Sequence, residues 1–193
     1  MNPKFIVIDG IDGSGKTTLC AALMERLINA GHRVALASDP AYYRDRFRCC
    51  DDPIERLFLH AASRRRLWHT VIQPALNDGA IVICDRWAKS TLAYQHYGSM
   101  LPFSLVEEIT NLSIEGMVKP TEILLMIEPT VAMERLRNRV DRAYFDQQDL
   151  QFYYRVQWGY IANMDGLGLD SSQPTELLCD QIMKFLEHKN ERN

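Results

Sequence analysis

The amino-acid sequence predicts an α/β fold, in which a parallel sheet of about five strands is flanked by helices on both faces. Short apolar runs of strand character alternate along the chain with longer stretches whose apolar residues recur at helical spacing. The runs are apolar throughout, which is typical of parallel strands buried on both faces. Gly31 and Gly79 also stand where helices are expected to end.

The strands and helices follow one another in regular order. The expected strands cover Phe5 to Asp9, Arg33 to Ala37, Ala80 to Cys84, Glu122 to Ile127 and Leu167 to Leu169. The expected helices cover Thr17 to Ala30, Ile54 to Leu76, Phe103 to Glu115, Val131 to Arg139, Leu150 to Asn163 and Thr175 to His188. Because such sheets bind ligands beyond the carboxyl ends of their strands, the residues that follow each strand are site candidates.

Length and composition narrow the class of protein. A chain of 193 residues without repeats or linkers fits one α/β domain. A net charge of -3 argues against a protein devoted to binding nucleic acid. Its five cysteines lack C-x-x-C spacing and so indicate neither a disulfide framework nor a zinc site. No stretch approaches the roughly 18 apolar residues of a membrane span, so we expect a cytoplasmic protein.

The clearest functional motif follows the first strand directly. Residues 10–17 read G-I-D-G-S-G-K-T, which fulfils the phosphate-binding pattern G-x-x-x-x-G-K-[ST]. Its glycines let backbone N–H groups turn toward phosphate oxygens, and the following helix adds the positive end of its dipole. Lys16 should reach the β- and γ-phosphates, and the Thr17 hydroxyl should ligate Mg²⁺. The nucleotide-binding residues predicted here are Gly10, Asp12, Gly13, Ser14, Gly15, Lys16, Thr17 and Thr18.

A second motif follows the third strand, and it carries a family resemblance. Residues 85–95 read D-R-W-A-K-S-T-L-A-Y-Q, and this run together with the phosphate-binding loop resembles the thymidylate kinase family. The resemblance covers most of the chain. It implies a P-loop kinase domain over residues 1–193, with ATP as phosphoryl donor, Mg²⁺ as cofactor, a pyrimidine deoxynucleotide as acceptor and assembly into a homodimer.

The resemblance implies catalytic roles for the residues after the third strand. Asp85 would orient the metal beside Thr17, although a helix-capping role is the alternative. Arg86 offers a planar, bidentate fork to the acceptor phosphate or the transferring group, where the alternative is a surface ion pair.

A lid over ATP is implied for the segment around residues 135–148. It would bring positive charge to the transfer site and exclude water, although plain surface charge is the alternative. Since Gly13 and Ser14 stand where some family members carry a loop arginine, the catalytic cation should come from this lid. Arg139 and Arg142 are then catalytic and Arg135 binds ATP; the lid arginines are Arg135, Arg137, Arg139 and Arg142.

The resemblance also implies an acceptor pocket with polar edges beside aromatic faces, which suits a pyrimidine and its sugar. Core packing with a satisfied hydroxyl is the alternative for Tyr94, and closing a turn is the alternative for Asp12. The residues implied are Asp12, His60, Arg64, Thr91, Tyr94, Gln95 and Tyr160.

The sequence departs from the family pattern mainly on the acceptor side. Where the family has T-R-E-P, with an arginine that grips the acceptor phosphate, residues 37–40 read A-S-D-P. His60 stands where a phenylalanine stacks on the base, and the D-R pair at residues 141–142 falls about two positions early. Three functions therefore stay open. The first is phosphorylation of dTMP to dTDP, with an arginine among Arg44, Arg46 and Arg48 in place of the lost one. The second is phosphorylation of 5-hydroxymethyluracil within DNA by way of the arginines between Arg44 and Arg66, and the third is nucleotide binding without catalysis.

Overall fold

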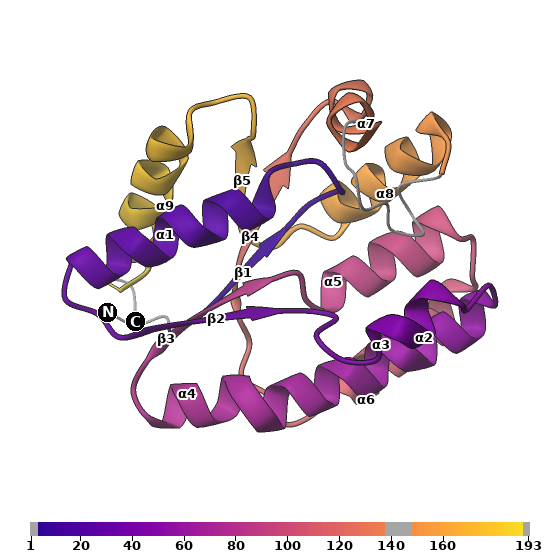
Figure 1. The fold of residues 1–193 in the computed structure, drawn as a ribbon, viewed down its shortest axis with the longest axis horizontal. Coiled ribbons are helices and arrows are strands. Elements are labelled where there is room, and N and C mark those ends of the chain that lie inside the picture. Colours follow the sequence, from indigo (N-terminus) through magenta and orange to yellow (C-terminus); the bar gives the residue numbers. More distant parts are fainter. Residues whose placement is uncertain (1–3, 138–147, 191–193) are drawn as a thin grey trace.

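A parallel sheet forms the centre of the molecule. The computed structural model describes residues 4–137 and 148–190 (Figure 1). Its strands stand in the order β2-β3-β1-β4-β5, and every neighbouring pair is parallel. The strands are β1 (Phe5–Asp9), β2 (Val34–Ser38), β3 (Ile81–Asp85), β4 (Thr121–Met126) and β5 (Leu167–Asp170). The predicted fold class is confirmed.

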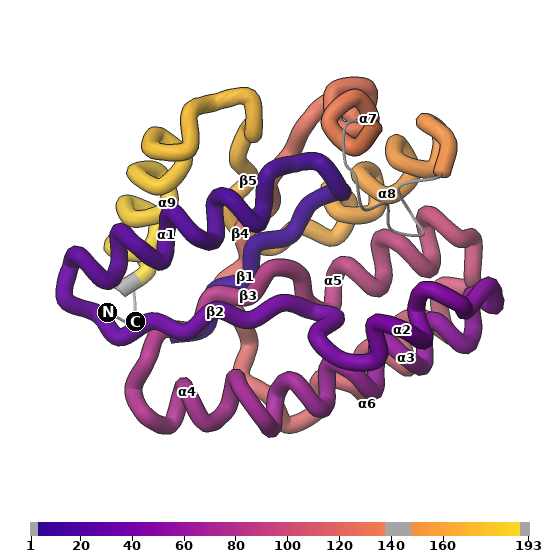
Figure 2. Tube along the Cα trace, in the orientation of Figure 1, coloured from indigo at the N-terminus to yellow at the C-terminus, as the bar shows by residue number. Residues whose placement is uncertain are grey.

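Helices cover both faces of this sheet. Helices α1 and α9 lie side by side on one face, and α4 lies on the other (Figure 2). The α-helices are α1 (Lys16–Asn29), α2 (Arg44–Arg48), α3 (Pro53–Leu67), α4 (Gln73–Asn77), α5 (Ala88–Thr91), α6 (Phe103–Ile114), α7 (Pro129–Arg137), α8 (Leu150–Ala162) and α9 (Thr175–Asn190). Two π-helical segments, η1 (Trp68–Ile72) and η2 (Leu92–Gly98), link α3 to α4 and extend α5. Within the described ranges, no helix is both long and apolar enough to cross a membrane.

Alternation along β1 explains why its first four residues, Phe5 to Ile8, are all apolar. Ile6 and Ile8 pack into the core beneath α1 and α9, whereas Phe5 and Val7 pack on the opposite face with Trp68 of η1. Both faces of the strand are therefore removed from water, as expected for a central strand of a doubly covered parallel sheet.

The register of the strands brings the two sequence motifs together. Asp85 at the end of β3 is aligned with Ile8 of β1 on one side and with Ser38 of β2 on the other. All three strands end at the same edge, so the loop that follows β1 and the residues that follow β3 begin next to each other. The candidate site lies at this edge.

Candidate active site

The phosphate-binding loop is fixed between β4 and α7 by two of its glycines. A Cβ at Gly10 would lie 2.4 Å from the carbonyl oxygen of Leu125, and one at Gly13 would lie 2.6 Å from that of Ala132. Gly13 also has a positive φ of 82°, a conformation in which most other residues are strained. Arg135 of α7 donates a hydrogen bond of 3.1 Å to the Gly13 carbonyl. This predicted ATP-binding residue therefore contacts the loop.

Lys16 is buried at the start of α1, with 6% of its surface exposed. Its Nζ donates a hydrogen bond of 2.8 Å to the Ile11 carbonyl oxygen, within the same loop. Burial, reinforced by the like charge of Arg86, lowers the pKa of the Lys16 ammonium to about 8, although nearby carboxylates oppose this. A phosphate group would supply this ammonium with the counter-charge that a carbonyl dipole supplies only in part.

Thr17 and Asp85 come together as predicted for a metal site. The Thr17 hydroxyl donates a hydrogen bond of 2.7 Å to Oδ2 of Asp85. The other carboxylate oxygen of Asp85, Oδ1, is buried and has no hydrogen-bond partner among the described residues. A hydroxyl beside an unpaired carboxylate oxygen suits Mg²⁺, which binds proteins through few side chains and keeps waters and phosphates as its other ligands. Among the described residues, no group of three or more His, Cys, Asp or Glu side chains is placed so that it could hold a metal ion.

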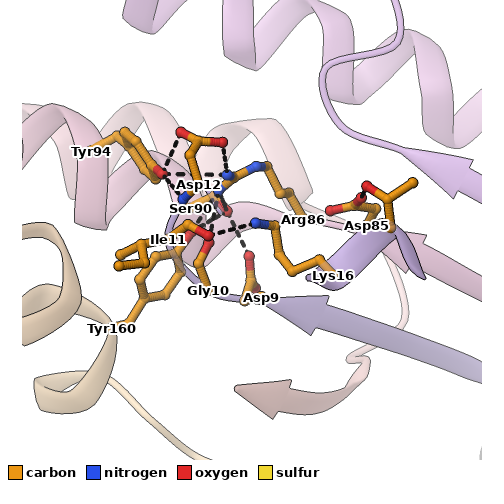
Figure 3. Close-up of polar contacts among 11 residues, drawn as sticks. Asp9, Gly10, Ile11, Asp12, Lys16, Asp85, Arg86, Ser90, Tyr94 and Tyr160 are labelled. Atoms are coloured by element: carbon orange, nitrogen blue, oxygen red, sulfur yellow. Dashed lines mark hydrogen bonds and ion pairs between the residues drawn. The ribbon is translucent and has the colours of Figure 1, made fainter. Parts of the chain in front are cut away.

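Arg86 projects toward the phosphate-binding loop from a backbone conformation rare for a non-glycine residue, with φ at 72°. Its Nη2 donates to Oδ1 of Asp12 at 2.6 Å, and its Nη1 donates to the Gly10 carbonyl at 3.1 Å (Figure 3). The guanidinium also lies 5.0 Å from the centre of the Tyr94 ring. Such a conformation costs about 1 to 3 kcal/mol and persists at functional sites where surrounding contacts determine it.

Asp12 and Tyr94 complete the environment of this arginine. The Tyr94 hydroxyl donates to Oδ2 of Asp12 at 2.7 Å and accepts from the Asp12 backbone N–H at 2.9 Å. Burial alone would raise the pKa of the Asp12 carboxyl, but the positive charges of Arg86 and Lys16 and the hydrogen bond from Tyr94 hold it below its usual value. The Tyr94 ring packs in the core and its hydroxyl is satisfied by Asp12, as in the core-packing alternative; a contact with the acceptor stays a prediction.

The predicted acceptor residues Arg64, Thr91 and Gln95 are all buried. Arg64 donates to Oδ2 of Asp39 at 2.8 Å, to the Ser113 hydroxyl at 2.9 Å and to the Thr91 hydroxyl. Both amide atoms of Gln95 are buried without a hydrogen-bond partner among the described residues. Unpaired polar atoms are costly in a protein interior, and a bound polar ligand would relieve that cost.

His60 occupies a half-buried position on α3, and its ring centre lies 4.6 Å from that of Phe47. Burial and the positive charges of Arg64 and Arg56 lower the pKa of this imidazole well below its usual value. His60 is therefore neutral at pH 7 and offers a flat ring backed by an aromatic side chain.

Most of the remaining predicted residues lie in the described part of the chain. Ser14 is buried in the loop and Tyr160 is buried on α8, whereas Gly15 and Thr18 are exposed. Arg139 and Arg142 lie outside the described residues, as does most of the predicted lid.

Three polar residues near the site escaped the sequence interpretation: Asp9, Asp39 and Ser90. Asp9 ends the apolar strand β1 and is buried, with 4% of its surface exposed. The sequence did contain a signal for Asp9. A carboxylate at the end of a buried strand needs a hydrogen-bond partner or a counter-charge nearby, and so indicates a polar site there. Asp39 stands in the A-S-D-P run and holds Arg64, and Ser90 belongs to the motif after β3.

Known proteins match this chain over nearly its whole length. The family model described as thymidylate kinase matches residues 8–182. A thymidylate kinase of Deinococcus radiodurans is 36% identical to the chain, with 92% of this chain and 93% of the relative covered. One of Bacillus thuringiensis is 30% identical, with 98% and 99% covered. The crystal structure of thymidylate kinase from Ehrlichia chaffeensis has a TM-score of 0.75 at 27% identity and covers 95% of this chain and 97% of its own. With the phosphate-binding loop and the residues after β3 assembled at one edge of the sheet, the chain belongs to the thymidylate kinase family.

Proposed function

We propose that this protein transfers the γ-phosphoryl group of ATP to dTMP and so forms dTDP and ADP. The observation that carries the proposal is the contact between Asp12 of the phosphate-binding loop and Arg86 of the motif after β3, at 2.6 Å. It joins the donor motif to the acceptor motif, as a direct transfer between two bound nucleotides requires. The named thymidylate kinases among its relatives support the same reaction.

On the donor side, the phosphates of ATP lie along the loop between β1 and α1. Lys16 exchanges its contact with the Ile11 carbonyl for the β- and γ-phosphates and neutralises the charge that develops during transfer. Thr17 and Asp85 would hold Mg²⁺, which would supply positive charge to the phosphates of ATP. Arg139 and Arg142, by their resemblance to the family's lid, add positive charge at the transferring group.

On the acceptor side, an oxygen of the dTMP phosphate attacks the γ-phosphorus in line with the departing ADP oxygen. Arg86 orients that phosphate, and Asp12 and Tyr94 would hold the sugar. Arg64, Thr91 and Gln95 would contact the edge of the base. Since the buried amide of Gln95 can both donate and accept, it can match the neighbouring N–H and C=O groups of thymine.

DNA as the acceptor is less well supported by the arginines between Arg44 and Arg66. Arg56 and Arg64 are buried, with 4% and 1% exposed, and contact protein atoms. Arg46 pairs with Glu55 at 2.7 Å. These contacts leave fewer arginines of the segment for a DNA backbone than the sequence suggested.

A panel of acceptors tests the proposed reaction. The protein is incubated with ATP, Mg²⁺ and, in turn, dTMP, dUMP, 5-hydroxymethyl-dUMP, dCMP, dGMP or DNA that contains 5-hydroxymethyluracil, and ADP release is measured. We expect the highest kcat/KM with dTMP, and no stimulated release from Lys16→Ala. Release stimulated only by the DNA, or by no acceptor, would contradict the proposal. The homodimer that the family resemblance implies stays a prediction, which sedimentation equilibrium would check.

A further inference from the structure

A chain of hydrogen bonds runs from Arg86 to a buried carboxylate that has no assigned role. Nη1 of Arg86 donates to the Tyr160 hydroxyl at 3.0 Å, and this hydroxyl lies 2.6 Å from that of Ser90. Ser90 in turn donates to Oδ1 of Asp9 at 2.5 Å (Figure 3). The chain joins β1, α5 and α8. Its inner members are almost sealed from water, since Asp9, Ser90 and Tyr160 are 4%, 9% and 2% exposed.

The chemistry of its two ends fixes the direction of this chain. A guanidinium can only donate hydrogen bonds, and at the other end Oδ1 of Asp9 accepts one from Ser90. Because Ser90 gives its single proton to Asp9, Tyr160 must give its own to Ser90 and accept from Arg86. Each hydroxyl is thus polarised in the same sense, from the positive end to the negative end. In a water-free interior, such aligned bonds strengthen one another.

The two nitrogens at the tip of Arg86 therefore have different anchors. Nη2 is held by Asp12, which belongs to the phosphate-binding loop. Nη1 reaches the Gly10 carbonyl of the same loop, but it also donates to Tyr160 and, at 3.4 Å, to Ser90. Both of these residues are supported in the core by Asp9, to which Ser90 donates. The backbone N–H of Arg86 itself donates to the Ile8 carbonyl of β1 at 3.0 Å, so the turn from which the arginine projects is anchored on the sheet. Asp12 and Gly10 thus tie the guanidinium to the ligand-binding loop, whereas Tyr160 and Ser90 tie its Nη1 to the core.

We propose that Asp9 and Ser90 are positioning residues for phosphoryl transfer, which hold the guanidinium of Arg86 in line with the reacting phosphates through Tyr160 and through the longer contact between Ser90 and Nη1. This inference rests on the proposed function, in which Arg86 orients the acceptor phosphate. Phosphoryl transfer depends on positioning and electrostatic stabilisation, so a misdirected arginine slows the chemical step more than it weakens nucleotide binding.

A double-mutant cycle tests whether these residues act as one chain. Ser90→Ala removes the middle link, and Tyr160→Phe removes the hydroxyl but keeps a ring that can pack beside Tyr94. We expect each change to lower kcat roughly tenfold, with KM for ATP within about twofold of the wild type. The kcat of the double variant should be no lower than that of the slower single variant, because loss of either residue already interrupts the same chain of hydrogen bonds. Losses that multiply to about a hundredfold would overturn the proposal.

A matched control separates positioning from general damage to the core. Ser171 is a serine as buried as Ser90, at 9% exposed, and its hydroxyl has no hydrogen-bond partner among the described residues. Ser171→Ala should leave kcat unchanged. Ser90→Ala with the kcat of the wild type and a lowered thermal midpoint would show a purely structural serine, and would also overturn the proposal.

A spectroscopic measurement tests the inference independently of the acceptor. The Nε–H signal of Arg86, identified by its loss in Arg86→Lys, is followed in nitrogen-15 NMR spectra of the whole protein. We expect it to move in Ser90→Ala, Tyr160→Phe and Asp9→Asn, and to keep its position in Ser171→Ala. An unmoved signal in the chain variants overturns the inference, whereas failure of the acceptor panel with a moved signal counts against the proposed function alone.

Discussion

At the scale of single residues, the ligand-free site contains buried charged groups that are incompletely paired, and a bound ligand would supply the missing partners. Lys16 is buried beside the like charge of Arg86, and its Nζ contacts a carbonyl oxygen rather than a carboxylate. Asp85 keeps one buried oxygen unpaired among the described residues. Such groups lower the stability of the ligand-free protein, and this is the usual relation between function and stability at active sites.

Replacement of Lys16 by methionine should therefore stabilise the ligand-free protein while abolishing phosphoryl transfer. The pKa of Lys16 is lowered to about 8, from the usual 10.5 of a lysine in water. Below pH 8 the lysine is charged in both the folded and the unfolded state, so burial of the charge costs its full amount. As the pH rises from 8 to 10.5, the folded protein loses this proton first and the cost disappears.

The measurement is thermal or urea unfolding of Lys16→Met and wild type at about pH 7 and about pH 10.5. We expect a gain on the order of 3 kcal/mol or less at pH 7, and a much smaller gain at pH 10.5. Lys184→Met, at an exposed lysine of α9, serves as the control and should differ little from wild type at either pH. The difference in free energy of unfolding between Lys16→Met and the wild type should be larger at pH 7 than at pH 10.5. A smaller difference at pH 7 would contradict the sign of this effect.

The functional residues of the two motifs were predictable from sequence, but the buried residues that hold them in place were not. Thr17 and Asp85 could be paired in advance because parallel strands end at a common edge and each motif follows a strand directly. Asp9 and Ser90 escaped because their partner Tyr160 lies 70 residues beyond Ser90, and the contact depends on how α8 packs. Local spacing carries no information about such a contact.

At the scale of elements, the long periodic helices were predicted well and the short segments near the site were missed. The stretch from Ile54 to Leu76 was expected as one helix, but it contains the π-helical segment η1. Pro74, which follows η1, has no N–H to donate to the preceding turn, so the regular hydrogen-bond ladder is interrupted there. The segments α2, α5 and η2 are short or irregular, and tertiary contacts rather than local periodicity determine them.

The packing of α7 on the phosphate-binding loop gives a prediction at this scale. Gly13 and Gly31 have similar positive φ angles of 82° and 85°. A Cβ at Gly13 would lie 2.6 Å from the Ala132 carbonyl oxygen, whereas one at Gly31 would meet nothing within 4 Å. Gly31→Ala therefore reports the backbone strain alone, and Gly13→Ala reports the strain together with the displacement of α7 from the loop.

We expect Gly31→Ala to lower the free energy of unfolding by about 1 kcal/mol, with kinetic constants unchanged. Gly13→Ala should cost at least about 1 kcal/mol more and raise KM for ATP, because the loop must move away from α7. Urea unfolding and steady-state kinetics of the two variants provide the comparison. Equal stability losses, with normal ATP kinetics in both variants, would show that α7 does not constrain the loop.

At the scale of the whole molecule, the strand order explains how motifs about 70 residues apart form one site. Because β1 and β3 are neighbours in the order β2-β3-β1-β4-β5, Gly10 and Arg86 follow adjacent strands. The helices on both faces bury the sheet and leave its edge as the place where polar side chains gather. The fold class was predictable from the alternation of strands and helices, but the sequence did not specify this order.

The same arrangement predicts that nucleotides stabilise the whole chain as one cooperative unit. A ligand at a hundred times its Kd adds about 2.7 kcal/mol to the free energy of unfolding. For a chain of this length, that raises the thermal midpoint by roughly 5 to 10 °C. We therefore expect a single unfolding transition that shifts upward with Mg²⁺ and a non-hydrolysable ATP analogue, and further when dTMP is added. Lys16→Met should lose most of the first shift, since its loop lacks the ammonium that contacts the phosphates. Two separate transitions, of which only one responds to nucleotide, would contradict the single domain expected for residues 1–193, and a response to the ATP analogue without one to dTMP would place the error in the proposed acceptor.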